Sequence, residues 1–407
     1  YVSPLDKTQN WIMADGNTAG ALGSIFGGVQ LTAWYPITPA SSLVEALIEY
    51  MPKYRVEPET GKSTYAIVQA EDELSAIGMA VGGGWAGLRS MTSTSGPGLS
   101  LMAEYLGLAF FAEVPLVIWD VQRVGPSTGL PTRTAQGDIT QAHFSSHGDR
   151  RFITLLPCSV NECFEFGWKA LDVAERFQTP VLVMSDLDLG MNHWMTPKFE
   201  YPDKPIDRGK VLWEDDLAKI LDERNGDWGR YLDIDGDGIP YRTIPGNQHT
   251  KSGYFGRGTG HDEYTKYSED PIVWERVLTR IMKKFETAKD YIPAPILEKD
   301  YQSRVGIIAY GSTDPAVSEA CDILAADGRY YDYLRLRATP FTKEVKTFLE
   351  NHDEIFIVEM NHDGQMRQLL LMEFPEYAVK IKKAARSNGM PFSAANVIEL
   401  ISKKEEK

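Results

Sequence analysis

The chain has 407 residues, of which 43% are hydrophobic, so it is long enough for two or three domains and has the apolar side chains to fill their cores. Its net charge of −15 and the lack of a concentrated basic stripe argue against nucleic acid as a ligand. No apolar run approaches the ~20 residues of a membrane-spanning helix, and three cysteines (Cys158, Cys163 and Cys321) are too few and too widely spaced for a four-cysteine iron–sulfur cluster.

Short apolar runs alternate with helical stretches rich in small residues from Gly16 to Asp188. This alternation is typical of repeated strand–helix units around a parallel sheet. The predicted strands are Leu31–Trp34, Ala66–Gln69, Leu116–Val121, Phe152–Leu155 and Val181–Met184. The predicted helices between them include Ser41–Tyr50, Glu73–Trp85 and Val160–Arg176. We therefore predict an α/β domain over residues 1–195.

The pattern changes after residue 195. Pro, Gly, Asp and Tyr are frequent there, which predicts an irregular insertion and connector over residues 196–300 with a helix at Pro271–Lys289 near its end. The strand–helix rhythm then resumes, and a second, smaller α/β domain is predicted over residues 301–407. Its predicted elements are strands at Val305–Tyr310, Tyr331–Leu336 and Glu354–Glu359 and a helix at Ala316–Asp327.

The segment YPITPASS, residues 35–42, lies where a predicted strand ends and a helix begins. Ligands of open α/β sheets bind at that edge. Thr38 stands between two prolines, which would hold its hydroxyl toward the crevice, while Ser41 or Ser42 would cap the helix. A rigid turn with a helix cap is the alternative interpretation.

The segment QAEDELSAIG, residues 69–78, places three carboxylates where a strand meets a helix. The helix dipole favours acidic residues in a first turn, which accounts for Glu71 and Asp72. Glu73 is different, because the Ala- and Gly-rich helix after it would let a facing chain or a flat ligand approach closely.

The segment TSTSGPGLS, residues 92–100, is predicted as a hydroxyl- and glycine-rich loop that opens a helix. Such a loop either cradles a phosphate through its N–H groups or is a turn with a capped helix. It lacks the lysine of a P-loop. The glycines between Gly16 and Gly23 do not have the dinucleotide-binding spacing either, so a nicotinamide site is rejected.

The segment QRVGPSTGLPTR, residues 122–133, follows the strand Leu116–Val121. Arg123 and Arg133 lie in a loop stiffened by Gly and Pro, and a planar guanidinium suits bidentate binding of a carboxylate. Two surface arginines are the alternative. His143 and His147 follow closely and would either contact a second, distal carboxylate or serve in packing.

Three aspartates, Asp233, Asp235 and Asp237, imitate the start of an EF-hand loop. Position twelve of that loop would be Ile244, where a bidentate Glu is required, so a Ca²⁺ or Mg²⁺ site is a weaker interpretation than a plain Asp/Gly turn.

Taken together, the four polar segments resemble the α subunit of 2-oxoacid:ferredoxin oxidoreductases, most closely the 2-oxoglutarate branch. The resemblance extends to DGDGIPYRT at residues 235–243, to GHDEY at residues 260–264 and into the second α/β domain. It implies a pyrimidine-type thiamine-diphosphate domain followed by a transketolase-C-like domain. It also implies a β-type partner subunit that binds the diphosphate, Mg²⁺ and a [4Fe–4S] cluster.

The resemblance further implies roles for individual residues. Glu73 would hydrogen-bond the pyrimidine nitrogen of thiamine diphosphate, with Pro36 and Ile37 beside the cofactor. Arg123 and Thr38 would act in catalysis and bind the substrate's carboxylate and keto oxygen, together with Thr132 and Arg133. No catalytic residue is assigned to the second domain.

The implied reaction is the reversible, coenzyme A-dependent oxidative decarboxylation of 2-oxoglutarate to succinyl-CoA and CO₂, with electrons passing to ferredoxin. We expect a dimer of heterodimers in the cytoplasm, where few cysteines fit the reducing environment. Pyruvate or a branched-chain 2-oxoacid as substrate, and a non-catalytic subunit that only docks a catalytic partner, remain alternatives. A γ-type domain ahead of Tyr1 is left open.

Overall fold

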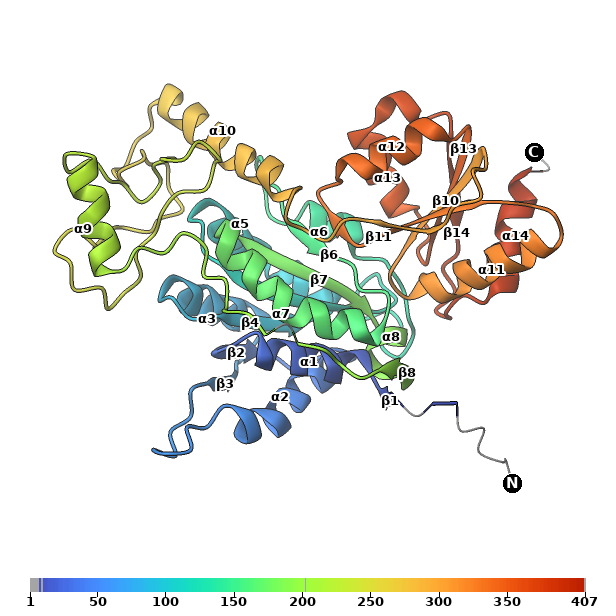
Figure 1. The fold of residues 1–407 in the computed structure, drawn as a ribbon, viewed down its shortest axis with the longest axis horizontal. Coiled ribbons are helices and arrows are strands. Elements are labelled where there is room, and N and C mark those ends of the chain that lie inside the picture. Colours follow the sequence, from blue (N-terminus) through green and yellow to red (C-terminus); the bar gives the residue numbers. More distant parts are fainter. Residues whose placement is uncertain (1–6, 9, 202, 406–407) are drawn as a thin grey trace.

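The structure is a computed structural model that describes residues 7–8, 10–201 and 203–405. Two α/β units lie side by side, and a long excursion forms a third lobe at the far side of the first unit (Figure 1). The first unit holds a seven-stranded sheet and the second a five-stranded sheet, and a two-stranded ribbon completes the described strands. The predicted α/β class is confirmed.

The seven-stranded sheet has the order β12-β6-β7-β5-β4-β2-β3, and every neighbouring pair in it is parallel except β12–β6. Its strands are β2 (Leu31–Trp34), β3 (Ala66–Gln69), β4 (Ser90–Thr94), β5 (Leu116–Gln122), β6 (Ile153–Leu155), β7 (Pro180–Asp186) and β12 (Ala338–Thr339). Because parallel strands end at the same edge, the segments after β2, β3, β4, β5 and β7 lie together.

Two groups of helices pack on this sheet. The first group is α1 (Gly16–Phe26), α2 (Ser41–Tyr54), α7 (Val160–Phe177) and α8 (Leu187–Met191). The second group is α3 (Glu73–Trp85), α4 (Gly96–Leu101), α5 (Ala103–Phe111) and α6 (Ile139–His143). The glycines of α1 serve close packing, since a Cβ on Gly23 would lie 2.1 Å from the carbonyl oxygen of Phe164 in α7.

The second unit has a five-stranded sheet in the order β14-β13-β10-β11-β9, in which only β9 is antiparallel to its neighbour. The strands are β9 (Ile296–Lys299), β10 (Val305–Tyr310), β11 (Asp332–Leu336), β13 (Glu354–Glu359) and β14 (Ile381–Ala385). The helices are α11 (Asp314–Ala326), α12 (Lys343–Asn351), α13 (Gln365–Glu373) and α14 (Ala394–Glu405), with short 3₁₀ turns at Gly311–Thr313 and Pro375–Tyr377.

Two strands lie across the predicted domain boundaries. β9 precedes residue 300 yet pairs with β11 of the second sheet, and β12 follows residue 301 yet pairs with β6 of the first sheet. The hydroxyl groups of Thr154 and Thr339 are 2.6 Å apart at this second pairing. The division at residues 195 and 300 stays a prediction, and β12 carries the chain of the second unit back onto the edge of the first sheet.

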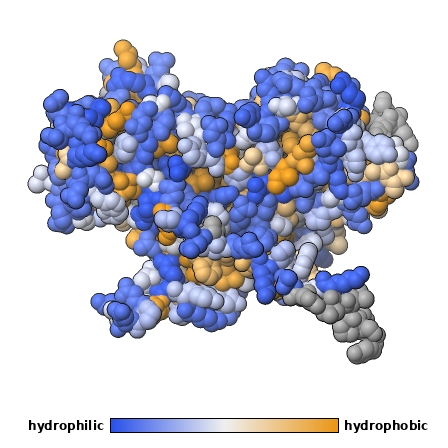
Figure 2. Space-filling view, in the orientation of Figure 1, coloured by the Kyte–Doolittle hydropathy of each residue, from blue (hydrophilic) through white to orange (hydrophobic). Residues whose placement is uncertain are grey.

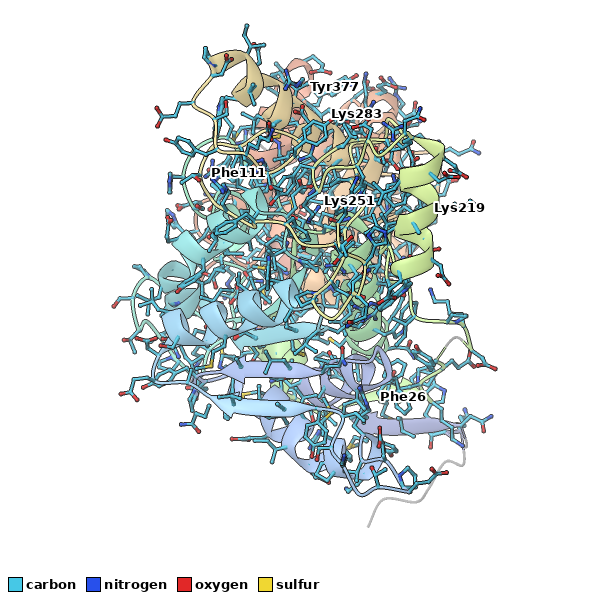
Figure 3. The ribbon with its side chains drawn as sticks, turned by 90° about the vertical axis from the view of Figure 1, so that its left-hand side faces the viewer. Phe26, Phe111, Lys219, Lys251, Lys283 and Tyr377 are labelled. Carbon is cyan, nitrogen blue, oxygen red and sulfur yellow. The ribbon has the colours of Figure 1, made fainter. Side chains whose placement is uncertain are left out.

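The excursion begins with β8 (Trp194–Pro197), which pairs antiparallel with β1 (Trp11–Ala14). It contains α9 (Glu214–Glu223) and ends with α10 (Pro271–Ala288), which confirms the helix predicted over Pro271–Lys289. Figure 3 shows this lobe from its outer side, with Lys219 on α9 and Lys251 in the loop that follows. Hydrophilic residues dominate the visible surface of this lobe and of the second unit (Figure 2).

A buried charge cluster fastens α10 to the end of α5. The carboxylate of Glu113 accepts hydrogen bonds from Arg280 (3.0 Å) and Lys284 (2.8 Å), and Arg230 donates to its backbone carbonyl at 2.9 Å. Burial would raise the pKa of Glu113, but these cations hold it well below its ordinary value. The carboxylate therefore stays ionised inside the protein and anchors the excursion.

One predicted element was wrong. Residues 92–94 were predicted in a loop, but they form the end of β4, a fully buried strand between β2 and β5. The strand is rich in Ser and Thr, so a search for apolar runs does not find it. Its hydroxyl groups can still be buried when they are hydrogen-bonded, as Ser90 is to the carbonyl of Ala80 at 2.7 Å. Within the described residues, no helix is long and apolar enough to cross a membrane.

Two neighbouring glycines of α3 give a matched test of the packing. A Cβ on Gly84 would lie 2.1 Å from the carbonyl oxygen of Pro115, whereas a Cβ on Gly82 would meet nothing within 4 Å. We expect Gly84→Ala to destabilise the chain by about 1–3 kcal/mol and Gly82→Ala to stabilise it by about 0.5–1 kcal/mol. Thermal unfolding of the two variants measures both, and equal shifts would contradict the packing described.

Candidate active site

The four polar segments meet at the carboxyl edge of the first sheet. They follow β2, β3, β4 and β5, which are neighbours or near neighbours in one parallel array. The backbone N–H of Ala70 donates to the carbonyl of Trp34 at 2.8 Å, which joins the segment after β3 to the segment after β2. Segments that lie far apart in the sequence thereby form one polar surface.

Glu73 is the first residue of α3, and only 7% of its surface is exposed. Asp72 caps this helix by accepting a hydrogen bond from the N–H of Ser75 at 2.7 Å, which fixes where Glu73 begins the first turn. Glu73 Cγ and Oε1 would lie 2.7 and 3.0 Å from a Cβ on Gly98. The carboxylate accepts no hydrogen bond from any described residue, so its oxygens are free for a ligand.

Arg123 follows β5 and is also 7% exposed. Its Nη1 donates to the backbone carbonyl of Thr38 at 2.7 Å, while its buried Nε has no hydrogen-bond partner among the described residues. Thr38 itself is exposed, as is Pro36, and Ile37 is half-buried. The structure therefore brings Arg123 and Thr38 together through the backbone and leaves the guanidinium with free donors.

A cavity of about 610 Å³ lies between the two units and contains Arg123 in its wall. Gly96, Pro97 and Ser100 of α4 form another part of the wall, together with Asp138. The second unit contributes Asn361, His362, Asp363, Gln365 and Ser387. Glu73, Thr38, Thr132 and Arg133 are not among the lining residues, although Glu73 packs against Gly98 in the same short helix.

The contribution of the second unit was missed by the sequence analysis. The segment Asn361–Gln365 follows the buried strand β13, so the rule that ligands bind where parallel strands end would have indicated it. Asp138 was also missed, because its importance depends on side chains from other elements.

Gln136 connects the two units. Its side chain donates to the carbonyl of Tyr310 at 2.8 Å and accepts from the N–H of Met360 at 2.9 Å. Its backbone N–H donates to Met360 O at 2.8 Å, and its carbonyl accepts from Asn361 Nδ2 at 3.0 Å. The segment that carries Arg123 and Asp138 is thus held against the second sheet.

The sequence is similar to those of known α subunits over almost its whole length. It is 35% identical to 2-oxoglutarate synthase subunit KorA of Methanothermobacter thermautotrophicus over 356 residues, which cover 86% of this chain and 88% of that subunit. The chain belongs to the α-subunit family of 2-oxoacid:ferredoxin oxidoreductases. Residues 22–208 also match the family described as pyruvate flavodoxin/ferredoxin oxidoreductase, thiamine diphosphate-binding.

Other members of the α-subunit family are longer. The α subunit of 2-oxoacid:ferredoxin oxidoreductase 1 from Sulfurisphaera tokodaii is 36% identical over 412 residues, which cover 99% of this chain but 63% of that subunit. The chain thus spans about three fifths of the length of such relatives.

Two solved structures are similar to this chain, to different degrees. The 2-oxoglutarate:ferredoxin oxidoreductase from Magnetococcus marinus, solved with 2-oxoglutarate, coenzyme A and succinyl-CoA bound, has a TM-score of 0.88 and 29% identity, and the match covers 99% of this chain and 67% of that one. A split-gene transketolase shares the fold alone, with a TM-score of 0.53 and 11% identity over 95% of this chain and 97% of that one.

Several residues that the sequence predicts in the substrate site lie away from the cavity. Thr132 and Arg133 are exposed, and the methylene groups of Arg133 pack near Gly389 of the second unit. His143 lines a different cavity, where burial and the nearby Arg151 and Arg150 lower its pKa to about 4. His147 lies at the surface, 3.5 Å from Glu104.

The aspartate loop already has a cation. Lys210 Nζ lies 2.7 Å from Asp235 and 2.8 Å from Asp237, while Asp233 accepts hydrogen bonds from the N–H groups of Asp237 and Gly238. Among the described residues, no group of three or more His, Cys, Asp or Glu side chains is arranged to hold a metal ion. These contacts favour the plain turn over the Ca²⁺ site.

The connection through Gln136 can be tested by its removal. Gln136→Ala leaves Tyr310 O and Met360 N without their side-chain partners, and each unsatisfied buried group costs roughly 1–3 kcal/mol. We expect a clear drop in the thermal unfolding midpoint. Gln248→Ala is the control, because Gln248 is exposed and bonds only the local carbonyl of Gly246 with its amide. Equal midpoints for the two variants would contradict the connecting role.

Proposed function

We propose that this chain is the α-type subunit of a thiamine-diphosphate-dependent 2-oxoglutarate:ferredoxin oxidoreductase. The proposed reaction is the reversible, coenzyme A-dependent oxidative decarboxylation of 2-oxoglutarate to succinyl-CoA and CO₂. The observation that carries the proposal is the pair of free ionisable groups beside α4: the buried carboxylate of Glu73 and the buried guanidinium of Arg123. The KorA relatives and the Magnetococcus marinus enzyme support 2-oxoglutarate as the substrate.

The residues around Glu73 fit thiamine diphosphate. The carboxylate of Glu73 accepts no hydrogen bond from a described residue, and it packs directly against Gly98, where a Cβ would lie 2.7 Å from Glu73 Cγ and 3.0 Å from Glu73 Oε1. Glu73 would share a proton with the pyrimidine nitrogen of the cofactor, and Pro36 and Ile37 would border the ring. When bound, thiamine diphosphate supplies the carbon nucleophile for the 2-oxo carbon.

Arg123 would bind the carboxylate of the 2-oxoacid. Its backbone contact with Thr38 orients the guanidinium and leaves further N–H groups for a planar, bidentate partner. The hydroxyl group of Thr38 would contact the substrate beside Arg123. Contacts from Thr132 and Arg133 rest on the family resemblance alone, because both residues lie away from the cavity. Such contacts would orient the 2-oxo carbon for attack.

The remaining parts of the site would come from a β-type subunit. It would bind the diphosphate with Mg²⁺ and hold the [4Fe–4S] cluster that passes electrons to ferredoxin, in a dimer of heterodimers. The three cysteines of this chain are buried, and burial raises the pKa of each thiol, that of Cys321 to about 12. Cluster ligation requires thiolates, so these cysteines are poor ligands.

The role of Glu73 is tested in the complex of this chain with the subunit that co-purifies with it. We expect Glu73→Gln to lower the turnover rate by about 10²- to 10⁴-fold, because the amide no longer accepts and returns a proton. Glu71→Gln, at an exposed neighbouring position, is the matched control. An unchanged rate for Glu73→Gln would favour a non-catalytic, docking subunit, and full activity of the isolated chain would contradict the shared site.

The substrate is tested by comparing 2-oxoglutarate, pyruvate and a branched-chain 2-oxoacid in the same complex, with ferredoxin reduction as the readout. We expect the largest kcat/KM for 2-oxoglutarate. Arg123 contacts only the carboxylate that all three acids share, so Arg123→Lys should raise KM for each of them. A larger kcat/KM for pyruvate would reject the 2-oxoglutarate assignment and keep the class of reaction.

A further inference from the structure

A second acidic site lies under the cavity and has no place in the proposed chemistry. Asp120 lies in β5, is completely buried, and neither oxygen of its carboxyl group has a hydrogen-bond partner among the described residues. An ionised carboxylate in that position would carry the full cost of desolvation without compensation. The geometry therefore requires a proton on or beside Asp120.

A hydrogen bond to Gln122 brings Asp138 toward Asp120, and the two carboxyl groups interact electrostatically. Side chains two residues apart on a strand point to the same face, so Asp120 and Gln122 project together. Gln122 accepts a hydrogen bond from the backbone N–H of Asp138 at 3.0 Å. The Asp138 oxygens would lie 2.6 and 2.8 Å from a Cβ on Gly96, and its buried Oδ2 has no partner in the described chain.

Arg123 is a cation that acts on this pair, and it lies with Asp138 in the wall of the same cavity. Burial raises the pKa of Asp120 well above its ordinary value, and Asp138 raises it further. Burial also raises the pKa of Asp138, to about 7, while the charge of Arg123 opposes this shift. The pair as a whole therefore loses its first proton near neutral pH.

Other titratable groups around the pair are engaged elsewhere or stand apart. On β7, Asp186 accepts hydrogen bonds from Thr134 and Ser312. At the rim of the cavity, His362 and Asp363 pair with each other at 2.8 Å. Glu73 approaches from α3 but faces Gly98. Arg123 is therefore the charge to which the protonation of Asp138 is coupled.

We infer that Asp120 and Asp138 form an electrostatically coupled acid pair that keeps the charge of Arg123 available to the carboxylate of the substrate. With Asp138 protonated, the guanidinium is uncompensated and attracts an anion. With Asp138 ionised, the two charges offset each other and the anion is held less tightly. Asp138 is thus a positioning residue, and by linkage, binding of a carboxylate to Arg123 draws a proton onto Asp138. The role in substrate binding rests on the proposed function, whereas the acid pair itself does not.

The acid pair is tested first by unfolding of the full chain. The pKa of Asp138 in the folded chain lies above the ordinary value of 3.8. The free energy of unfolding therefore falls as pH rises from about 4 to about 7, and Asp138 lowers it no further above that pH. We expect the thermal unfolding midpoint of Asp138→Asn to rise relative to that of the parent between pH 6 and about 7.5. Above that pH the difference between the two midpoints should stay constant. Asp149→Asn, at an exposed carboxylate, should follow the parent throughout.

A constant difference between Asp138→Asn and the parent across this range would overturn the acid pair. Asp138→Ser is the second neutral variant, should the amide variant fail to fold, and carries the same expectation. These measurements need neither cofactor nor partner, so they decide on the pair whether or not the proposed function holds.

The coupling to Arg123 is tested by kinetics of the complex with its partner subunit. We expect the KM of the parent for 2-oxoglutarate to rise on the order of tenfold from pH 6.5 to pH 8.5, and the KM of Asp138→Asn to lose this rise. The same rise in both proteins would overturn the coupling. If the complex turns over no 2-oxoacid, the proposed function fails and the coupling with it, while the unfolding series still decides on the pair.

Discussion

The hydrogen bonds of Gln136 are the interaction on which the cavity depends. All four of its hydrogen-bonding contacts lead into the second unit, to Tyr310, Met360 and Asn361. An amide buried between two sheets is stable only when every donor and acceptor is paired, so the two units have one docked arrangement at this point. The segment that carries Arg123 and Asp138 is positioned as a consequence.

The parallel sheet provides the second constraint. Strands that run in one direction deliver their following loops to one edge, and this chain places a different polar group on each loop. Glu73 arrives after β3, Gly98 after β4 and Arg123 after β5. The resulting surface offers a carboxylate and a guanidinium from two different loops.

Buried acids behave in opposite ways within the same unit. Glu113 has Arg280 and Lys284 beside it, stays ionised and anchors the excursion. Asp120 has another carboxyl group as its neighbour, and the favoured state is protonated. Burial raises the pKa of both residues, and the sign of the neighbouring charge decides the outcome. Glu113 holds the excursion in place, and Asp120, with Asp138, is inferred to control how much of the charge of Arg123 is available to a ligand.

Local sequence patterns determined most of the first unit: β2 and α3 have the bounds that were predicted, because hydrophobic periodicity and capping act over a few residues. The polar segments at strand ends also indicated Glu73 and Arg123. Only the tertiary structure decided that β4 is a strand, that the segment from Asn361 faces Arg123, and that Asp138 lies beside Asp120. These contacts join residues from separate elements, and their energies depend on burial and on the docking of two sheets, which no local pattern records.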